Sequence, residues 1–136
     1  MSTQTVKIEF PGGKKVNARI GDFLIQTDQS VKAGGEASAP EPFDHFLASI
    51  ATCAGIYALG FCKSRDLPTD GMDLNMVCEG DAKKKMFTRM SLHLTLPAGF
   101  PEKYRAGIER AMELCAVKRH IMDAPEFSVE LHTLDT

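Results

Sequence analysis

Two cysteines are the residues of this chain whose type and placement could support redox chemistry. Cys53 lies in the middle of the uncharged run Phe46–Cys62, and Cys115 closes an apolar stripe in a second predicted helix. A cysteine thiolate is a nucleophile, and a second thiol can convert its oxidised form into a disulfide. Free cysteine is also among the most buried residue types, so a role in packing is the alternative for each of them.

The other two cysteines are better explained by packing. Cys62 follows Cys53 by nine residues, about 900° of helical rotation, so the two thiols face opposite sides of one helix and cannot pair within it. Cys78 continues the apolar face of a predicted strand. The apolar stripe that ends in Cys115 must pack on another element, and the long helix is the obvious partner. Cys53 and Cys115 are therefore the two thiols that the fold could bring together.

A reactive Cys53 would need a group that favours its thiolate. A free thiol has a pKa near 8.5 and is mostly protonated at neutral pH. Cys53 lies beyond the first turn of its own predicted helix, where the helix dipole has faded, and burial alone raises a thiol pKa. The sequence thus predicts that a cation approaches Cys53.

Composition limits the class of protein. The chain has 136 residues, 43% hydrophobic and 25% charged, with a net charge of −2. These values indicate one globular domain and exclude a disordered chain, while the near-neutral charge argues against nucleic-acid binding. The four cysteines suit a reducing compartment, and the polar start of the chain predicts no signal peptide. Zinc-site, phosphate-loop and GxSxG motifs are missing from the sequence, so we expect no metal or nucleotide cofactor.

The elements that must position the cysteines follow from hydrophobic periodicity. Polarity alternates in five segments, the apolar segment 23–27 after a possible turn at Gly21-Asp22 is a sixth predicted strand, and two segments have helical character. The predicted order is strands at 6–10, 16–20 and 23–27, a loop at 29–42, a helix at 42–65, strands at 72–79 and 86–96, a helix near 104–115 and a strand at 127–131. This order predicts an α+β fold.

The uncharged run within the first helix falls just short of a membrane span. We interpret it as a helix buried on most sides. A chain of 136 residues has difficulty covering such a helix completely, so the run also hints at a second chain.

Two segments resemble the OsmC/Ohr family. Ala39–Cys53 (APEPFDHFLASIATC) is similar to the proline-containing loop and long buried helix that carry the first cysteine of that family. Leu114–Val117 (LCAV) is similar to its second cysteine motif, and the 62-residue separation of the cysteines suits the family. The resemblance covers essentially all of residues 1–136 and implies a single OsmC-like domain. It also implies an intertwined homodimer, in which antiparallel sheets wrap around the long central helices.

The resemblance implies a cofactor-free peroxidase reaction at two catalytic residues. Cys53 would attack a hydroperoxide to become a sulfenic acid, and Cys115 would condense with it to a disulfide. The family activates its first cysteine with an arginine that a glutamate orients. The candidate here is Arg19, the only arginine before the long helix, with Lys14 and Lys15 as substitutes and an outward-facing strand position as the alternative for Arg19. Phe43 occupies the position of the family glutamate and cannot orient an arginine, and Asp44 follows it, as in a less characterised branch of the family. Asp44 is therefore the candidate supporting acid; it lies nine residues before Cys53, on the far side of its own helix, so it could act only through the dimer.

The sequence therefore favours a cytoplasmic, thiol-dependent reductase of organic hydroperoxides that serves oxidative-stress defence. Its expected partners are a second copy of the chain, a small hydroperoxide, and an external thiol or dithiol such as a lipoyl group, with neither nucleic acid nor membrane. The alternative is a non-catalytic dimeric protein of the same fold, which binds a ligand or senses redox state through its thiols. A third interpretation assigns both cysteines to the core.

Overall fold

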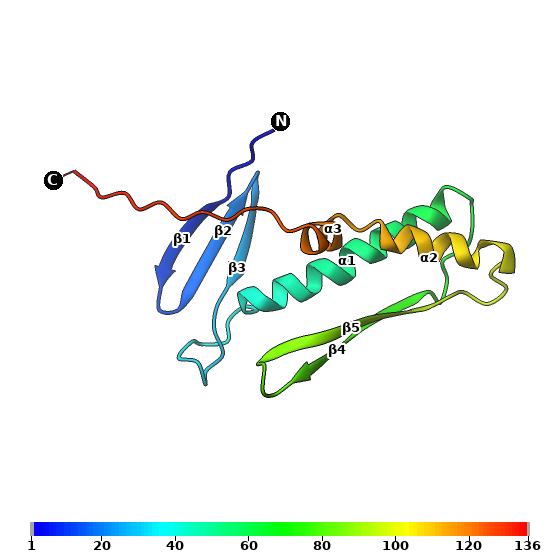
Figure 1. The fold of residues 1–136 in the computed structure, drawn as a ribbon, viewed down its shortest axis with the longest axis horizontal. Helices are drawn as coiled ribbons and strands as arrows, with labels where there is room; N and C mark the ends of the chain where they lie inside the picture. Colours follow the sequence, from blue (N-terminus) through cyan, green and yellow to red (C-terminus); the bar gives the residue numbers. More distant parts are fainter. Residues whose placement is uncertain (1, 136) are drawn as a thin grey trace. The chain divides into compact units, whose positions relative to one another are not determined.

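The order of elements is α+β, as the sequence predicts, with antiparallel sheets and one long helix (Figure 1). The computed structural model describes residues 2–135. It divides into two compact units, one up to Ser49 and one from Ile50 onward. The division falls within helix α1 (Pro42–Lys63), so α1 contributes its first turns to one unit and the rest to the other.

The first unit contains an antiparallel sheet with the strand order β1 (Lys7–Gly12), β2 (Lys15–Ile20) and β3 (Phe23–Thr27). The strands form because apolar and polar residues alternate, and glycines with positive φ turn the chain between them. The pairing aligns Ile8 with Ala18 and Ala18 with Ile25, so these side chains share one face.

The loop that leads from β3 to α1 is held by a buried carboxylate. Asp28 has no exposed surface. Its Oδ2 accepts hydrogen bonds from the backbone N–H groups of Glu36 (3.3 Å) and Ser38 (3.1 Å) and from the Ser38 hydroxyl (2.6 Å). Its Oδ1 accepts one from the Gln29 N–H at 2.7 Å. The carboxylate thus ties both ends of the loop together immediately before α1, and we call this arrangement the Asp28 clasp.

The Asp28 clasp predicts a specific loss of stability in acid. The hydrogen bond from Ser38 and the N–H groups of Gln29, Ser38 and Glu36 lower the pKa of Asp28 from 3.8 to about 2. Because the pKa is lower in the folded state, the stabilisation is fully present above about pH 4 and disappears as the pH falls towards 2. We expect the difference in denaturant midpoint between the wild type and Asp28→Asn to be large at pH 7 and to narrow progressively between pH 4 and pH 2. A difference that does not change over that range would contradict this role of the carboxylate.

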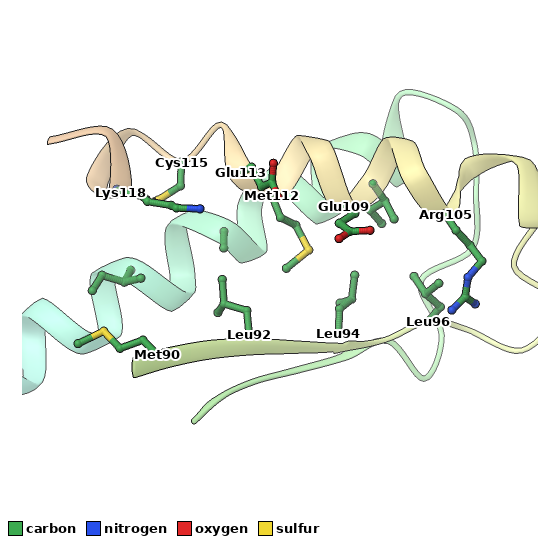
Figure 2. Close-up of a pocket in the computed structure, with 13 residues that line it drawn as sticks. Met90, Leu92, Leu94, Leu96, Arg105, Glu109, Met112, Glu113, Cys115 and Lys118 are labelled. Atoms are coloured by element: carbon green, nitrogen blue, oxygen red, sulfur yellow. The ribbon is translucent and has the colours of Figure 1, made fainter. Parts of the chain in front are cut away.

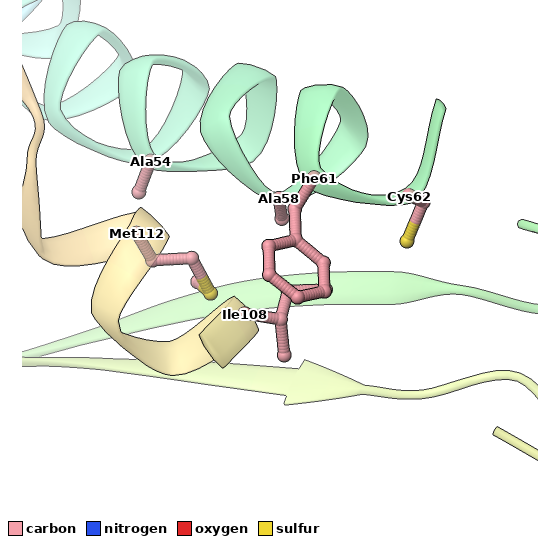
Figure 3. Close-up of a cluster of buried hydrophobic side chains, with 6 residues drawn as sticks. All are labelled: Ala54, Ala58, Phe61, Cys62, Ile108 and Met112. Carbon is pink, nitrogen blue, oxygen red and sulfur yellow. The ribbon is translucent and has the colours of Figure 1, made fainter. Parts of the chain in front are cut away.

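The second unit packs helices against a two-stranded hairpin. Strands β4 (Asp73–Asp81) and β5 (Met86–Thr95) pair antiparallel, and a short 3₁₀ turn, η1 (Glu102–Tyr104), leads into α2 (Arg105–Glu113). A last helix, α3 (Ala116–Met122), follows α2 after two residues. Figure 3 shows the core between α1 and α2, which consists of Ala54, Ala58, Phe61, Cys62, Ile108 and Met112.

Three details differ from the sequence prediction. Helix α1 ends at Lys63 rather than Arg65. The stripe predicted to end in Cys115 belongs to a helix that stops at Glu113, and the short helix α3 was not predicted. The strand predicted at 127–131 is wrong for the described chain, because residues 124–135 have no regular secondary structure. Its apolar side chains Phe127, Val129 and Leu131 are 89–93% exposed. A strand forms only beside another strand, and no other strand pairs with this segment in the described chain.

A cysteine pair at the start of helix α3

The two predicted cysteines meet in the second unit. Cys53 projects from α1, and Cys115 occupies the residue immediately before α3. Cys115 has an extended backbone (φ −52°, ψ 122°) and serves as the N-cap of α3, because its Sγ accepts a hydrogen bond from the Lys118 N–H at 3.4 Å. The Cys115 thiol in turn donates a hydrogen bond to the Cys53 sulfur. The two thiols therefore interact with each other, and no disulfide joins them in this structure.

The group that favours the Cys53 thiolate is a pair of backbone amides. The N–H of Val117 lowers the pKa of Cys53 most, the Cys115 thiol lowers it further, and the N–H of Ala116 adds to them against the opposing effect of burial. Hydrogen bonds to the charged form of a group stabilise that form. The sequence predicted a cation for this task, whereas the contacts that lower the pKa here come from the first turn of α3.

The surroundings of Cys115 shift its pKa in the opposite direction, upward. Only 1% of its surface is exposed, and burial raises the pKa of its thiol. Its contacts with the Cys53 sulfur raise that pKa further, although the Lys118 N–H opposes them. The environment thus separates the two cysteines into one that favours the thiolate and one that favours the thiol. This is the division of roles that a nucleophile and a resolving cysteine require.

This separation predicts unequal alkylation. At pH 7 we expect iodoacetamide to modify Cys53 about tenfold faster than Cys115, because Cys53 is both more ionised and more exposed. Ala116→Pro removes one of the two amide donors and suits its position, since proline is tolerated at the first residue of a helix and Cys115 is already extended. This variant should slow alkylation of Cys53 severalfold at pH 7. Mass spectrometry of quenched samples measures both rates, and equal rates for the two cysteines would contradict the assignment.

A largely apolar groove of about 420 Å³ lies in the second unit and includes Cys115 in its lining (Figure 2). Alternate side chains of β5 point into it, opposite α2, and Cys115 and Lys118 lie at one end. Its apolar lining is Ile50, Ala54, Met90, Leu92, Leu94, Leu96, Ile108 and Met112. Arg105, Glu109, Glu113 and Lys118 add charged groups to the lining. The groove can take a hydrocarbon group, with polar contacts from these four residues.

The two supporting residues suggested by the sequence lie in the other unit. Arg19 is on β2, where its Nε forms an ion pair with Glu9 at 2.5 Å, and about half of its side chain is exposed. The Asp44 Oδ2 accepts a hydrogen bond from the Glu41 N–H at 3.0 Å, at the start of α1. Both have local structural partners, so their roles at Cys53 stay predictions. Phe43 is half exposed and stacks near Phe46, with ring centroids 5.4 Å apart.

The remaining cysteines occupy packing positions. Cys62 is fully buried in the core between α1 and α2, and burial raises the pKa of its thiol. Cys78 is half-buried on β4, paired with Met90 of β5. Both positions agree with the packing roles that the sequence favours.

Comparison with known proteins identifies the family. The model of the family described as OsmC-like protein matches residues 35–130, so the chain belongs to the OsmC-like family. No protein with a curated description matches the chain significantly. The apolar helix α1, which by length and composition could cross a membrane, is the core helix of this fold.

Solved structures share the fold at low sequence identity. A protein from Psychrobacter arcticus described as an osmotic stress induced and detoxification response protein aligns with a TM-score of 0.71 at 17% identity over 88% of each chain. An OsmC-like protein from Mycoplasma pneumoniae aligns with a TM-score of 0.64 at 13% identity, over 90% of this chain and 89% of that one. The organic hydroperoxide resistance protein OsmC of Legionella pneumophila aligns with a TM-score of 0.59 at 18% identity, over 89% and 90%.

Proposed function

We propose that this protein is a thiol-dependent hydroperoxide reductase that uses Cys53 and Cys115. The observation that carries the proposal is the hydrogen bond between two free cysteines whose pKa values are shifted in opposite directions by their surroundings. A family with a member named for organic hydroperoxide resistance supports the same chemistry. Free thiols persist in a reducing cytoplasm, which is where we expect the protein to act.

The reaction has two chemical steps before the protein is reduced again. The Cys53 thiolate attacks the distal oxygen of ROOH, the O–O bond breaks, and RO⁻ takes a proton to leave as an alcohol, so Cys53 becomes a sulfenic acid. The Cys115 sulfur then attacks the Cys53 sulfur, and the OH group leaves with the thiol proton as water. An external thiol or dithiol finally reduces the disulfide by exchange. The Ala116 and Val117 amides serve the first step, since they favour the attacking thiolate.

The groove favours organic hydroperoxides over hydrogen peroxide. Its floor consists of aliphatic side chains from three elements, and it ends at Cys115. A hydrocarbon group loses its unfavourable contact with water there, at about 25 cal/mol for each Å² buried. Hydrogen peroxide has no such group and gains nothing from the groove.

A stoichiometric reaction tests the proposal without any reductant. One equivalent of tert-butyl hydroperoxide should convert the reduced chain to a form about 2 Da lighter, release tert-butanol and yield a peptide that links Cys53 to Cys115. A full complement of free thiols after exposure to the peroxide would exclude the reaction. If the groove still bound hydrophobic ligands in that case, the non-catalytic ligand-binding protein would become the better description.

We infer further that the chain functions as a homodimer. One side of α1 packs on α2, while another side forms a shallow open hollow with residues that include Ala51, Gly55 and Leu59. Ile56 on that side is 59% exposed, and exposed apolar patches of this kind mark interfaces. In the first unit, Phe10 and Phe23 are 80% and 75% exposed, which supports a sheet that another chain covers.

Analytical ultracentrifugation tests the proposed dimer, because the sedimentation rate reports the oligomeric state. The wild type at micromolar concentration should sediment as a dimer, and Ile56→Asp should shift it to a monomer because a charge would be buried without a partner. Val31→Asp replaces another apolar residue that is 72% exposed, in the loop before α1, and should leave the dimer intact. A monomeric wild type would contradict the inference.

A further inference from the structure

The beginning of helix α3 is held by the sulfur atoms of the two cysteines. The first four N–H groups of any helix have no acceptor within the helix. In α3, the N–H groups of Ala116 and Val117 are directed to the Cys53 sulfur, and the N–H of Lys118 is directed to the Cys115 Sγ. Arg119 begins the internal ladder with a hydrogen bond of 3.0 Å to the Cys115 carbonyl. The first three N–H groups of α3, which have no acceptor within the helix, therefore all interact with the sulfur atoms of Cys53 and Cys115.

Other contacts secure α3 weakly. The helix has seven residues, none of them buried, and Lys118–Met122 are exposed. Its His120 Nδ1 contacts the Ala116 carbonyl at 2.6 Å, which joins the helix only to itself. Residues 124–135, which follow it, have no regular structure in the described chain and are exposed. Helices shorter than about 12 residues are marginal in water, so the contacts at the N-terminus decide whether α3 is ordered.

Oxidation removes the negative charge that makes the Cys53 sulfur a good acceptor for the N–H groups of Ala116 and Val117, whereas the Cys115 thiol is already neutral in the reduced protein. A thiolate carries a full negative charge, and hydrogen bonds to a charged acceptor are about twice as strong as neutral ones. The charge also interacts favourably with the N-terminal end of the helix dipole. In a disulfide both sulfurs are neutral and divalent, and their lone pairs accept hydrogen bonds poorly.

We propose that the Cys53–Cys115 pair is a redox-dependent cap, which keeps helix α3 ordered while the thiols are reduced and lets it fray when they form a disulfide. The proposal rests on the two-cysteine chemistry of the proposed function. It adds that oxidation changes the structure of residues 116–122, and that this change is readable from outside the site.

The fraying of α3 would open a route for the reductant. Thiol–disulfide exchange requires that an incoming thiolate reach one of the two sulfurs. Cys115 is only 1% exposed beside an ordered α3, so its sulfur is shielded in the reduced protein. A frayed α3 would uncover the Cys115 sulfur in the oxidised protein alone, when the reductant is needed.

Hydrogen exchange of a peptide that covers Ala116–Met122 tests the cap. Diamide oxidises the pair by taking one hydrogen from each thiol, so the oxidised sample does not depend on any reaction with peroxide. We expect exchange in this peptide to be about fivefold faster in the oxidised full-length protein than in the reduced one. In reduced samples, Cys115→Ala should exchange faster than the wild type. Cys115→Ser should remain protected, because its hydroxyl also caps a helix.

The outcomes separate this inference from the proposed function. A Cys53–Cys115 disulfide with unchanged exchange at 116–122 would overturn the redox-dependent cap and leave the proposed function intact. Failure of diamide to join the two cysteines would overturn both. Cys53→Ser treated with diamide is the matched control, and its exchange should not change, because the pair is missing. Faster exchange in that control would also contradict the cap, since it would show an effect of diamide unrelated to the pair.

Discussion

Cys53→Ser should lose hydroperoxide reduction by at least about a thousandfold, down to the rate seen without protein. The serine hydroxyl has nearly the same size, but it is not ionised at neutral pH and is a poor nucleophile towards the O–O bond. The backbone amides of α3 that favour a thiolate at this position would then have no anion to stabilise. The measurement is consumption of tert-butyl hydroperoxide with dithiothreitol, followed over the pH range 6–9.

The other cysteines provide matched controls for this loss. Cys115→Ser should keep activity within about threefold when a monothiol is the reductant, because the monothiol can reduce the Cys53 sulfenic acid directly. Its serine can still accept the Lys118 N–H, so α3 stays capped. Cys78→Ser changes a half-buried thiol on β4 and should behave as the wild type. Activity that survives in Cys53→Ser would require another nucleophile.

Among substitutions that add one methyl group to a glycine of the first unit, Gly35→Ala should be the most destabilising. A Cβ at this position would lie 2.2 Å from the Gln29 carbonyl oxygen and 2.8 Å from the Asp28 Oδ1. The first contact is with backbone, which cannot rotate away, and the second is with the carboxylate of the Asp28 clasp. We expect a loss of about 3 kcal/mol in the free energy of unfolding, at the upper end of the cost of overpacking. Denaturant titration monitored by circular dichroism measures it.

A second substitution in the same loop should increase the free energy of unfolding instead of lowering it. Ala37 has a positive φ of 52°, a region that costs residues with a Cβ about 1–2 kcal/mol. Ala37→Gly removes that strain but increases the entropy of the unfolded chain, so we expect a net stabilisation of at most about 1 kcal/mol.

If Gly35→Ala were as stable as the wild type, the close approach of residue 35 to the Asp28 clasp would not exist in solution.

Local patterns predicted most of the fold because the elements depend on local periodicity. The alternation around Ile8, Val16 and Leu92 and the uncharged run around Cys53 fall within the observed strands and helix. The pattern failed at 127–131, where alternation alone cannot supply a neighbouring strand. It also missed α3, since seven residues give barely two turns of period.

The pairing of Cys53 with Cys115 could be predicted from the sequence, but the groups that shift the pKa values of the two thiols in opposite directions could not. Spacing and helical stripes predicted that the fold could bring Cys53 and Cys115 together, and in the structure each sulfur shifts the pKa of the other through a hydrogen bond. The sequence indicated only a charged side chain as the group that could favour the thiolate, because the direction of a backbone amide cannot be read from residue types. Within the second unit, the N–H groups of Ala116 and Val117 lower the pKa of Cys53, and every residue except proline carries such a group. Only the fold reveals which amides are directed to a sulfur.

Because Cys62 is buried, the rate at which its thiol is labelled can report how often the core between α1 and α2 opens. Its thiol has no exposed surface and lies between α1 and α2, where burial also raises its pKa. A labelling reagent can reach it only when these helices separate, so its labelling rate under native conditions reports how often the core opens. Compared with the labelling rate in denaturant, that rate yields the free energy of opening in the intact molecule, independently of the chemistry at Cys53.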